Sequence, residues 1–164
     1  MKKPSLEKVN AFPELIPGDI LLYGDNSLLS WLIRFRTWSD VSHVEVYAGN
    51  GRTLAARVHG VREYPLSVLG LRRVIRPVEL FHFAAGLQWF EASACKLPYG
   101  YADLARFYLL NVPTKGLICS EFVDLFFRHC WLALFNLNYP EGAVCPRDFE
   151  TLSPYVAEQI WSWE

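Results

Sequence analysis

The sequence predicts a single α+β domain in which an antiparallel sheet packs on a buried helix. Two observations favour this class. Short β-branched and aromatic segments gather in the first half of the chain, and helical patterns gather in the second half. An Asn-Gly pair at 50–51 joins two strand-like segments, which is typical of a tight hairpin. The 164 residues suit one domain over 17–164, preceded by an extended arm over 1–16.

The expected strands are short and bounded by turn-forming residues. A turn at Pro17-Gly18-Asp19 comes before the first strand, and the Asn-Gly turn separates the second strand from the third. The expected strands cover residues 20–23, 43–48, 53–58, 61–64 and 73–78.

The expected helices have apolar residues at helical spacing. Asn26 or Ser27 can cap the first helix, and Pro146 suits the first position of a short helix near the end. The longest helix, over 120–135, is apolar almost all round and is therefore expected to be buried. The expected longer helices reach from the Asn26 or Ser27 cap to about Trp38, and cover Phe81–Lys96, Ala102–Leu110 and Ser120–Phe135.

Composition excludes several classes of protein. The 16 basic and 17 acidic residues exclude a globally basic nucleic-acid binder, and no apolar run is long enough for a membrane span. No apolar region follows the basic start, so we expect no signal peptide and a cytoplasmic location. Residues 34–76 hold eight Arg and three acids. We expect these Arg to pair with the acidic second half; the alternative is a positive rim that attracts an anionic substrate.

Of the four cysteines, Cys119 is the candidate nucleophile. The others show no CxxC pair or zinc-ligand spacing and are expected to be reduced thiols. Cys119 falls where a turn-rich segment leads into the longest helix, and a helix N-terminus favours a thiolate. The backbone N–H groups there can also stabilise an oxyanion. The alternative is an inert buried thiol.

His43 is the candidate base. Alternation along its strand places His43, Glu45 and Tyr47 on one face, with Val44 and Val46 on the other. A histidine beside a carboxylate suits a base with an orienting acid. The alternative is a small polar pair on a solvent-facing surface. The other histidines are expected to be structural or exposed: His59, His82 and His129.

Five short motifs, taken together, resemble those of a known family. Their order and spacing are similar to those of the circularly permuted NlpC-type cysteine hydrolases, which are papain-like. YiiX-like amidohydrolases are the nearest group, and the lecithin:retinol acyltransferase group is more distant. The resemblance implies a permuted papain-like fold with Cys119 as nucleophile and His43 as general base. The motifs are Gly18-Asp19-Ile20-Leu21, Ser42-His43-Val44, Leu97-Pro98-Tyr99, Cys119-Ser120-Glu121 and Val144-Cys145-Pro146.

One feature of that family is missing. YiiX-like relatives carry an acid on the strand after the histidine strand, which corresponds to Ala55-Ala56 here. A two-residue turn at 50–51 would pair Gly49 with Arg52, and continuing this register puts Glu45 opposite Ala56. We therefore expect Glu45 to replace the missing acid and to hold one ring nitrogen of His43.

The predicted function is a cysteine hydrolase that cleaves an amide through an acyl-enzyme. The substrate would be a peptide, including a cell-wall peptide. One alternative is a lipid acyl hydrolase or acyltransferase of the same fold, and another is a catalytically impaired binding or structural protein.

Several aromatic residues are candidates for a substrate groove or for an exposed surface. Tyr23 and Tyr99, with Tyr101, are candidates to line the groove. The favoured alternative for each is packing in the core or at its rim, with the hydroxyl bonded at the surface. We predict no cofactor and no metal, although His43, Glu45 and Cys119 together could supply ligands. Three further aromatics are expected to pack in the core, and the alternative is a face that touches a membrane: Trp31, Phe35 and Trp38.

Overall fold

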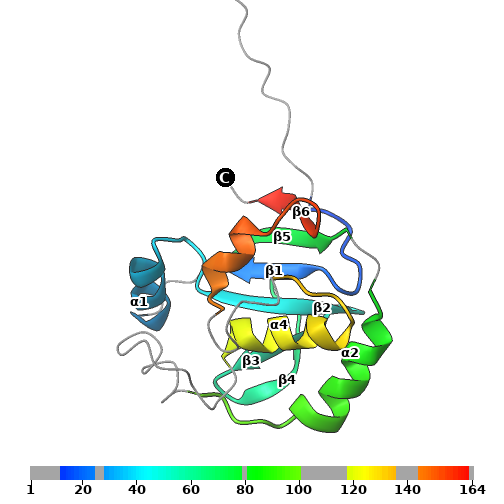
Figure 1. The fold of residues 1–164 in the computed structure, drawn as a ribbon. Coiled ribbons are helices and arrows are strands. Elements are labelled where there is room, and N and C mark those ends of the chain that lie inside the picture. Colours follow the sequence, from blue (N-terminus) through cyan, green and yellow to red (C-terminus); the bar gives the residue numbers. More distant parts are fainter. Residues whose placement is uncertain (1–11, 25–27, 79–80, 101–117, 136–143, 163–164) are drawn as a thin grey trace, which may run out of the picture.

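A computed structural model of the chain describes residues 12–24, 28–78, 81–100, 118–135 and 144–162. Its centre is a six-stranded sheet in the order β4-β3-β2-β1-β5-β6, with every neighbouring pair antiparallel (Figure 1). Helices complete a mixed α+β structure, as the sequence predicts. The strands are β1 (Ile20–Tyr23), β2 (His43–Gly49), β3 (Arg52–Arg57), β4 (Gly60–Pro65), β5 (Leu71–Pro77) and β6 (Ala157–Ser162).

The five expected strands are all present, and β6 is an addition that the sequence analysis missed. β6 pairs with β5 at the edge of the sheet. Its Glu158 and Gln159 are exposed side by side, which breaks the apolar alternation of a half-buried strand. Backbone pairing with β5 therefore makes this segment a strand without a clear signal in its side chains.

The hairpin between β2 and β3 has the expected turn but a different register. Gly49 pairs with Arg52, while Tyr47 pairs with Thr53, so Ala48 is an extra residue in β2. Gly49 adopts φ 95°, a left-handed conformation that glycine accommodates easily at a bulge. The expected pairing of Glu45 with Ala56 is therefore wrong, because the bulge shifts β3 by one residue.

The helices agree with the sequence in place but differ in length. The caps expected at Asn26 or Ser27 and the helix expected over 102–110 lie outside the described residues. The helix expected over 81–96 is α2 followed by one π turn, and Pro146 does begin the last, 3-10 helix. The observed helices are α1 (Leu28–Thr37), α2 (Phe83–Trp89), η1 (Phe90–Ala94), α4 (Cys119–His129) and η2 (Pro146–Thr151).

The helix expected to reach Phe135 ends six residues earlier, at His129. Trp131 takes a left-handed conformation with φ 64°, which stops the helix. Leu132 and Leu134 follow in an irregular segment but remain buried. The apolar run thus continues into the core after the helix has ended, which is why its length misled the prediction.

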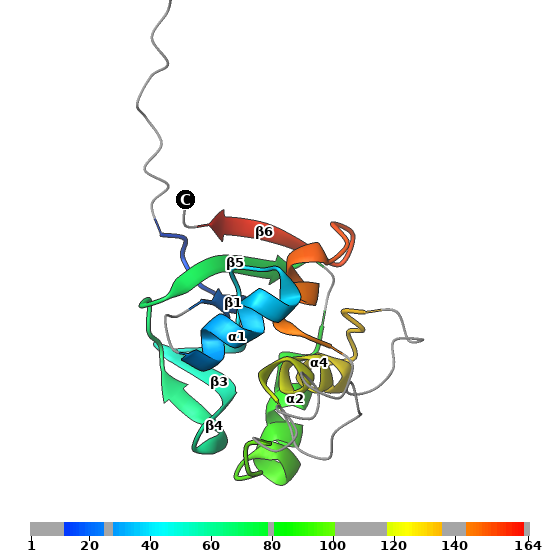
Figure 2. The same cartoon turned by 90° about the vertical axis from the view of Figure 1, so that its left-hand side faces the viewer.

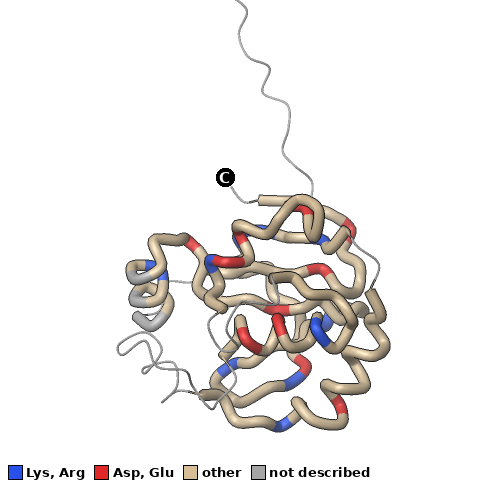
Figure 3. The backbone as a smooth tube through the Cα atoms, viewed as in Figure 1, with Lys and Arg blue, Asp and Glu red and all other residues tan. Residues whose placement is uncertain are grey.

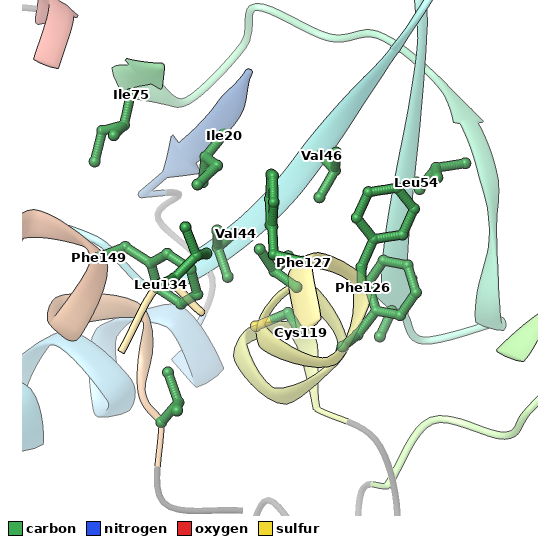
Figure 4. Close-up of a cluster of buried hydrophobic side chains, with 14 of the residues drawn as sticks. Ile20, Val44, Val46, Leu54, Ile75, Cys119, Phe126, Phe127, Leu134 and Phe149 are labelled. Atoms are coloured by element: carbon green, nitrogen blue, oxygen red, sulfur yellow. The ribbon is translucent and has the colours of Figure 1, made fainter. Parts of the chain in front are cut away.

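α4 and α2 lie side by side on one face of the sheet, and α1 lies beyond the end at which β2 begins (Figures 1 and 2). Phe126 and Phe127 of α4 pack with Val44 and Val46 of β2 in the main core cluster (Figure 4). Cys119 belongs to the same cluster. Burial of these apolar side chains therefore fixes α4 against β2.

Polar contacts fix the beginning of α4. The residue before the helix, Ile118, is extended, and its N–H donates to the Glu121 carboxylate at 3.2 Å. The buried Ser120 hydroxyl donates to the Val144 carbonyl at 2.6 Å. These bonds hold the first turn of α4, and with it Cys119, in a defined position.

Charges of both signs are interspersed over the sheet (Figure 3). Arg73 pairs with Glu150 of the second half, as expected, and also with Asp40. Arg76, in contrast, makes two 2.7 Å bonds to Asp19, which lies in the first half. Some Arg of the basic segment therefore pair within their own half of the chain, rather than across it.

The contact between α2 and α4 can be tested at Gly86. A Cβ there would lie 2.3 Å from the Cys130 sulfur and 2.9 Å from the Phe126 ring. Gly86→Ala is therefore expected to destabilise the protein by about 1–3 kcal/mol in urea unfolding, despite the better helix propensity of alanine. The exposed Gln88→Ala on the same helix should change stability by less than about 0.5 kcal/mol. A Gly86→Ala protein at least as stable as wild type would contradict this packing.

Candidate functional site

The structure brings Cys119 and His43 together. Cys119 is the first residue of α4 and His43 is the first residue of β2, and both elements begin on the same side of the molecule (Figure 1). The charge of Cys119 and its hydrogen bonding both raise the pKa of His43, so the two side chains interact. The residues that the sequence singled out as nucleophile and base are thus neighbours.

Glu45 contacts the same imidazole. The Nε2–H group of His43 donates to Oε1 of Glu45 at 2.9 Å, which leaves Nδ1 as the ring nitrogen available to the thiol. Val44 lies between them in sequence, but its side chain packs on the opposite face of the sheet, in the core. The alternation of the strand therefore delivers the histidine and the carboxylate to one face, as the sequence analysis expects.

Arg57 is the residue that the sequence analysis missed. Its Nε and Nη2 atoms each lie 2.6 Å from Oε1 of Glu45. The bulge at Ala48 shifts the register, so that Arg57 rather than Ala56 is on the face of Glu45. A bulge signal was present in the sequence, because Gly49 precedes the Asn-Gly turn and permits a positive φ.

Glu45 is a buried charge with two cationic partners. Its side chain is only 1% exposed. Burial by itself raises the pKa of Glu45, but the bond to His43 and the charges of His43 and Arg57 outweigh burial and lower it. The Thr53 hydroxyl acts in the same direction. The carboxylate is therefore ionised at neutral pH.

His43 is held in its protonated form. Burial lowers the pKa of His43, but the charge and hydrogen bond of Cys119, and then those of Glu45, raise it to about 10. The ring is not sealed from solvent, because the side chain is 24% exposed. The site can thus hold an imidazolium between two negative groups.

Cys119 is much less accessible than His43. Its exposed fraction is 3%, and it packs in the core cluster with Phe122 and Val123. Its backbone N–H lies in the first turn of α4, where the helix has no carbonyl partner for it. The arrangement therefore offers a thiol, a base and a backbone donor for an oxyanion.

A pocket of about 350 Å³ adjoins the histidine. Tyr23 and Tyr99 both line it, while Tyr101 lies outside the described residues. The Tyr23 hydroxyl donates to the Ser67 carbonyl at 3.0 Å, and burial raises the pKa of Tyr23. The other described lining residues are Ser30, Ile33, Ser42, His43, Glu45, Ala56, Arg57, Val58, Ser67 and Leu69.

The remaining cysteines and histidines lie outside this cluster. Burial raises the pKa of Cys130 to about 12 and that of Cys145 to about 11, which makes both thiols poor nucleophiles at neutral pH. His129, expected to be structural, stacks on Trp89 with ring centroids 4.5 Å apart and remains exposed. Within the described part of the chain, no group of three or more His, Cys, Asp and Glu residues could hold a metal ion.

The aromatic residues of α1, and Trp38 directly after it, are on the surface. Trp31 and Phe35 are exposed, and Trp38 is 84% exposed, so the expectation of core packing is wrong. Their rings stack in sequence, at 5.5 Å from Trp31 to Phe35 and 6.2 Å from Phe35 to Trp38. Of the helices in the described ranges, none is long and apolar enough to cross a membrane.

The charge state of His43 can be tested by NMR titration of its imidazole. We expect a pKa of about 10 in wild type and a lower value in Cys119→Ser, because Cys119 provides the largest contribution that raises it. This folded-state pKa exceeds the ordinary 6.5, so the proton on His43 contributes stability that is complete below about pH 6.5 and is lost as the pH rises through about 10.

The control for this titration is Cys95→Ser, which replaces a thiol at the end of η1 and should leave the titration of His43 unchanged. If Cys119→Ser leaves it equally unchanged, the thiol and the imidazole do not interact in solution.

Comparison with known proteins does not assign this chain to a family. No protein-family model matches the chain, and none of the curated proteins matches it.

Proposed function

We propose that the protein is a cysteine hydrolase that cleaves an amide bond in a peptide through an acyl-enzyme. The observation that supports this proposal is that His43 interacts with both Cys119 and Glu45. A thiol, a histidine and an orienting carboxylate are the three parts of a nucleophilic triad. The resemblance to the permuted NlpC-type hydrolases, including those that act on cell-wall peptides, implies the same nucleophile and base.

Each residue has a definite role in the proposed reaction. In the ion-pair form His43 carries the proton as an imidazolium, and the Cys119 thiolate beside it attacks the carbonyl carbon of the substrate. His43 then gives that proton to the nitrogen of the leaving amine, and a thioester remains on Cys119. A water molecule, which loses a proton to His43, attacks the thioester; the acid product leaves, and the ion pair is restored.

Glu45 orients the imidazole during both steps. Its bond to Nε2 keeps Nδ1 directed at the thiol and stabilises the imidazolium that forms when the thiol is deprotonated. The Cys119 N–H at the start of α4 is placed to donate to the oxyanion of the tetrahedral intermediate. These two groups stabilise charges that appear only during the reaction.

The pocket beside His43 favours a substrate with an apolar group next to the scissile bond. Ile33, Val58 and Leu69 contribute aliphatic surface, and Tyr23 and Tyr99 contribute aromatic surface. Burial of an apolar side chain in such a pocket stabilises the bound substrate. Serine hydroxyls from three different segments supply polar contacts in the same pocket: Ser30, Ser42 and Ser67.

The proposal is tested with p-nitrophenyl acetate as an acylating probe and a library of short peptides as substrates. Cys119→Ser and His43→Ala are each expected to lower the release of p-nitrophenolate and the hydrolysis of peptides at least about 100-fold. Mass spectrometry should locate the acetyl group on Cys119 in wild type.

Cys95→Ser is the matched control, because it removes a thiol without touching the site. If Cys119→Ser keeps the wild-type rate, or if the acetyl group resides on another residue, the hydrolase mechanism is wrong. If wild type neither acylates nor cleaves, the alternative of a catalytically impaired binding protein is favoured.

A second candidate function is a lipid acyl hydrolase or acyltransferase that uses the same thiol. The exposed aromatic face of α1 favours it, because Trp and Phe side chains partition to membrane interfaces. α1 also contributes Ser30 and Ile33 to the pocket, so a membrane bound to that face would lie near the site.

The lipid alternative is tested with vesicles of phosphatidylcholine and phosphatidylserine. It predicts vesicle binding that falls at least about tenfold in Trp38→Ala with Phe35→Ala, and an acyl chain from phospholipid on Cys119. Tyr155→Ala, which removes an equally exposed aromatic outside α1, is the control. Absence of both binding and acylation would leave the peptide hydrolase as the better account.

A further inference from the structure

We propose that Arg57 is a positioning residue of this site: it keeps Glu45 ionised throughout the reaction and directs its carboxylate at His43. The inference rests on the proposed function. It differs from the family pattern, in which the strand after the histidine strand contributes an acid. Here that strand, β3, contributes a cation, and the acid is on β2.

The contacts of Glu45 place two cations on a single oxygen. Oε1 accepts from Nε of Arg57 at 2.6 Å and from Nε2 of His43 at 2.9 Å, and Nη2 of Arg57 lies 2.6 Å from the same oxygen. Arg57 thus contacts the same carboxylate oxygen that binds the imidazole. A charge-assisted hydrogen bond from a guanidinium helps to fix the position of that oxygen.

Glu45 needs a permanent partner because it is buried. A carboxylate that is 1% exposed pays a large desolvation cost unless opposite charge compensates it. His43 compensates this charge only while it is protonated, and in the proposed reaction it gives its proton to the leaving amine. At that point Arg57 is the cation in contact with Glu45, since guanidinium does not deprotonate in this pH range.

Without Arg57, the carboxylate would tend to take up a proton whenever His43 became neutral. A protonated Glu45 would no longer stabilise the imidazolium, and His43 would become a weaker base for the next thiol or water. Arg57 therefore acts on the reaction through Glu45, without touching the thiol.

Arg57 is itself held in place. Its guanidinium carbon lies 4.5 Å from the centroid of the Tyr64 ring, which is a cation–π contact. The side chain is 31% exposed and lines the pocket, so small solutes can reach the space that it would vacate. This makes rescue by free guanidinium a practical test of its role.

The direct test is a ¹³C NMR titration of the Glu45 carboxyl group in Arg57→Ala and Arg57→Lys. This measurement needs no substrate and is therefore independent of the proposed function. We expect the titration of Glu45 to move upward by at least about one pH unit in Arg57→Ala, because one of its two charge partners is lost. Arg57→Lys keeps the positive charge but lacks the planar guanidinium group, and it should raise the Glu45 titration by a smaller amount.

The second readout is the rate of acylation by p-nitrophenyl acetate as a function of pH. In Arg57→Ala the maximal rate should fall at least about tenfold with KM changed less than about threefold, and the acidic limb of the profile should move upward with the Glu45 titration. Added guanidinium chloride at low concentration should restore part of the rate in Arg57→Ala and none in Cys119→Ser.

Arg52→Ala is the matched control, because Arg52 belongs to the same strand and forms an exposed ion pair with Glu63. Both readouts should be unchanged in this variant. If the Glu45 titration and the rate are also unchanged in Arg57→Ala while Cys119→Ser is inactive, the inference about Arg57 is overturned and the hydrolase proposal stands. If Glu45 shifts but Cys119→Ser acylates like wild type, the hydrolase proposal fails while the electrostatic role of Arg57 stands.

Discussion

The packing of α4 against the core face of β2 is the contact on which the candidate site depends. Phe126 and Phe127 are buried in the same core cluster as Val44 and Val46, and this apolar packing sets the position of the whole helix. Because α4 and β2 begin on the same side of the molecule, their first residues meet although they are far apart in the sequence (Figure 1). The hydrophobic effect thus positions the starts of α4 and β2 side by side. The chemistry of the site depends on the residues that begin these two elements, Cys119 and His43.

Charges of alternating sign then extend from the helix into the sheet. In the ion-pair form, the Cys119 thiolate faces the His43 imidazolium, which faces the Glu45 carboxylate, which faces the Arg57 guanidinium. Every charge lies next to an opposite one, so a largely buried set of ionised groups is compensated within the protein. Transfer of a proton from Cys119 to His43 changes only one end of this series, because Glu45 and Arg57 keep their charges.

Much of the fold and of the site could be predicted from the sequence, because local signals carried them. The strand alternation placed His43 and Glu45 on one face, and the turn formers before Cys119 indicated the start of a helix. The register of the hairpin could not be predicted, since a bulge depends on tertiary packing as well as on Gly49. Arg57 was missed for that reason. In the expected register, without the bulge, its side chain would lie on the face of the sheet opposite to Glu45. β6 and the early end of α4 were missed because sheet-edge pairing and a left-handed Trp131 leave weak signals in composition.

The central claim is that a thiol and an imidazole are neighbours in solution, and NMR tests it most directly. A nuclear Overhauser spectrum of the wild-type protein is predicted to contain cross-peaks between the ring protons of His43 and the β-protons of Cys119. Cross-peaks from the same ring to Tyr23, whose ring centroid is 6.2 Å from that of His43, serve as an internal reference. A spectrum with the Tyr23 cross-peaks but with none to Cys119 would contradict the account.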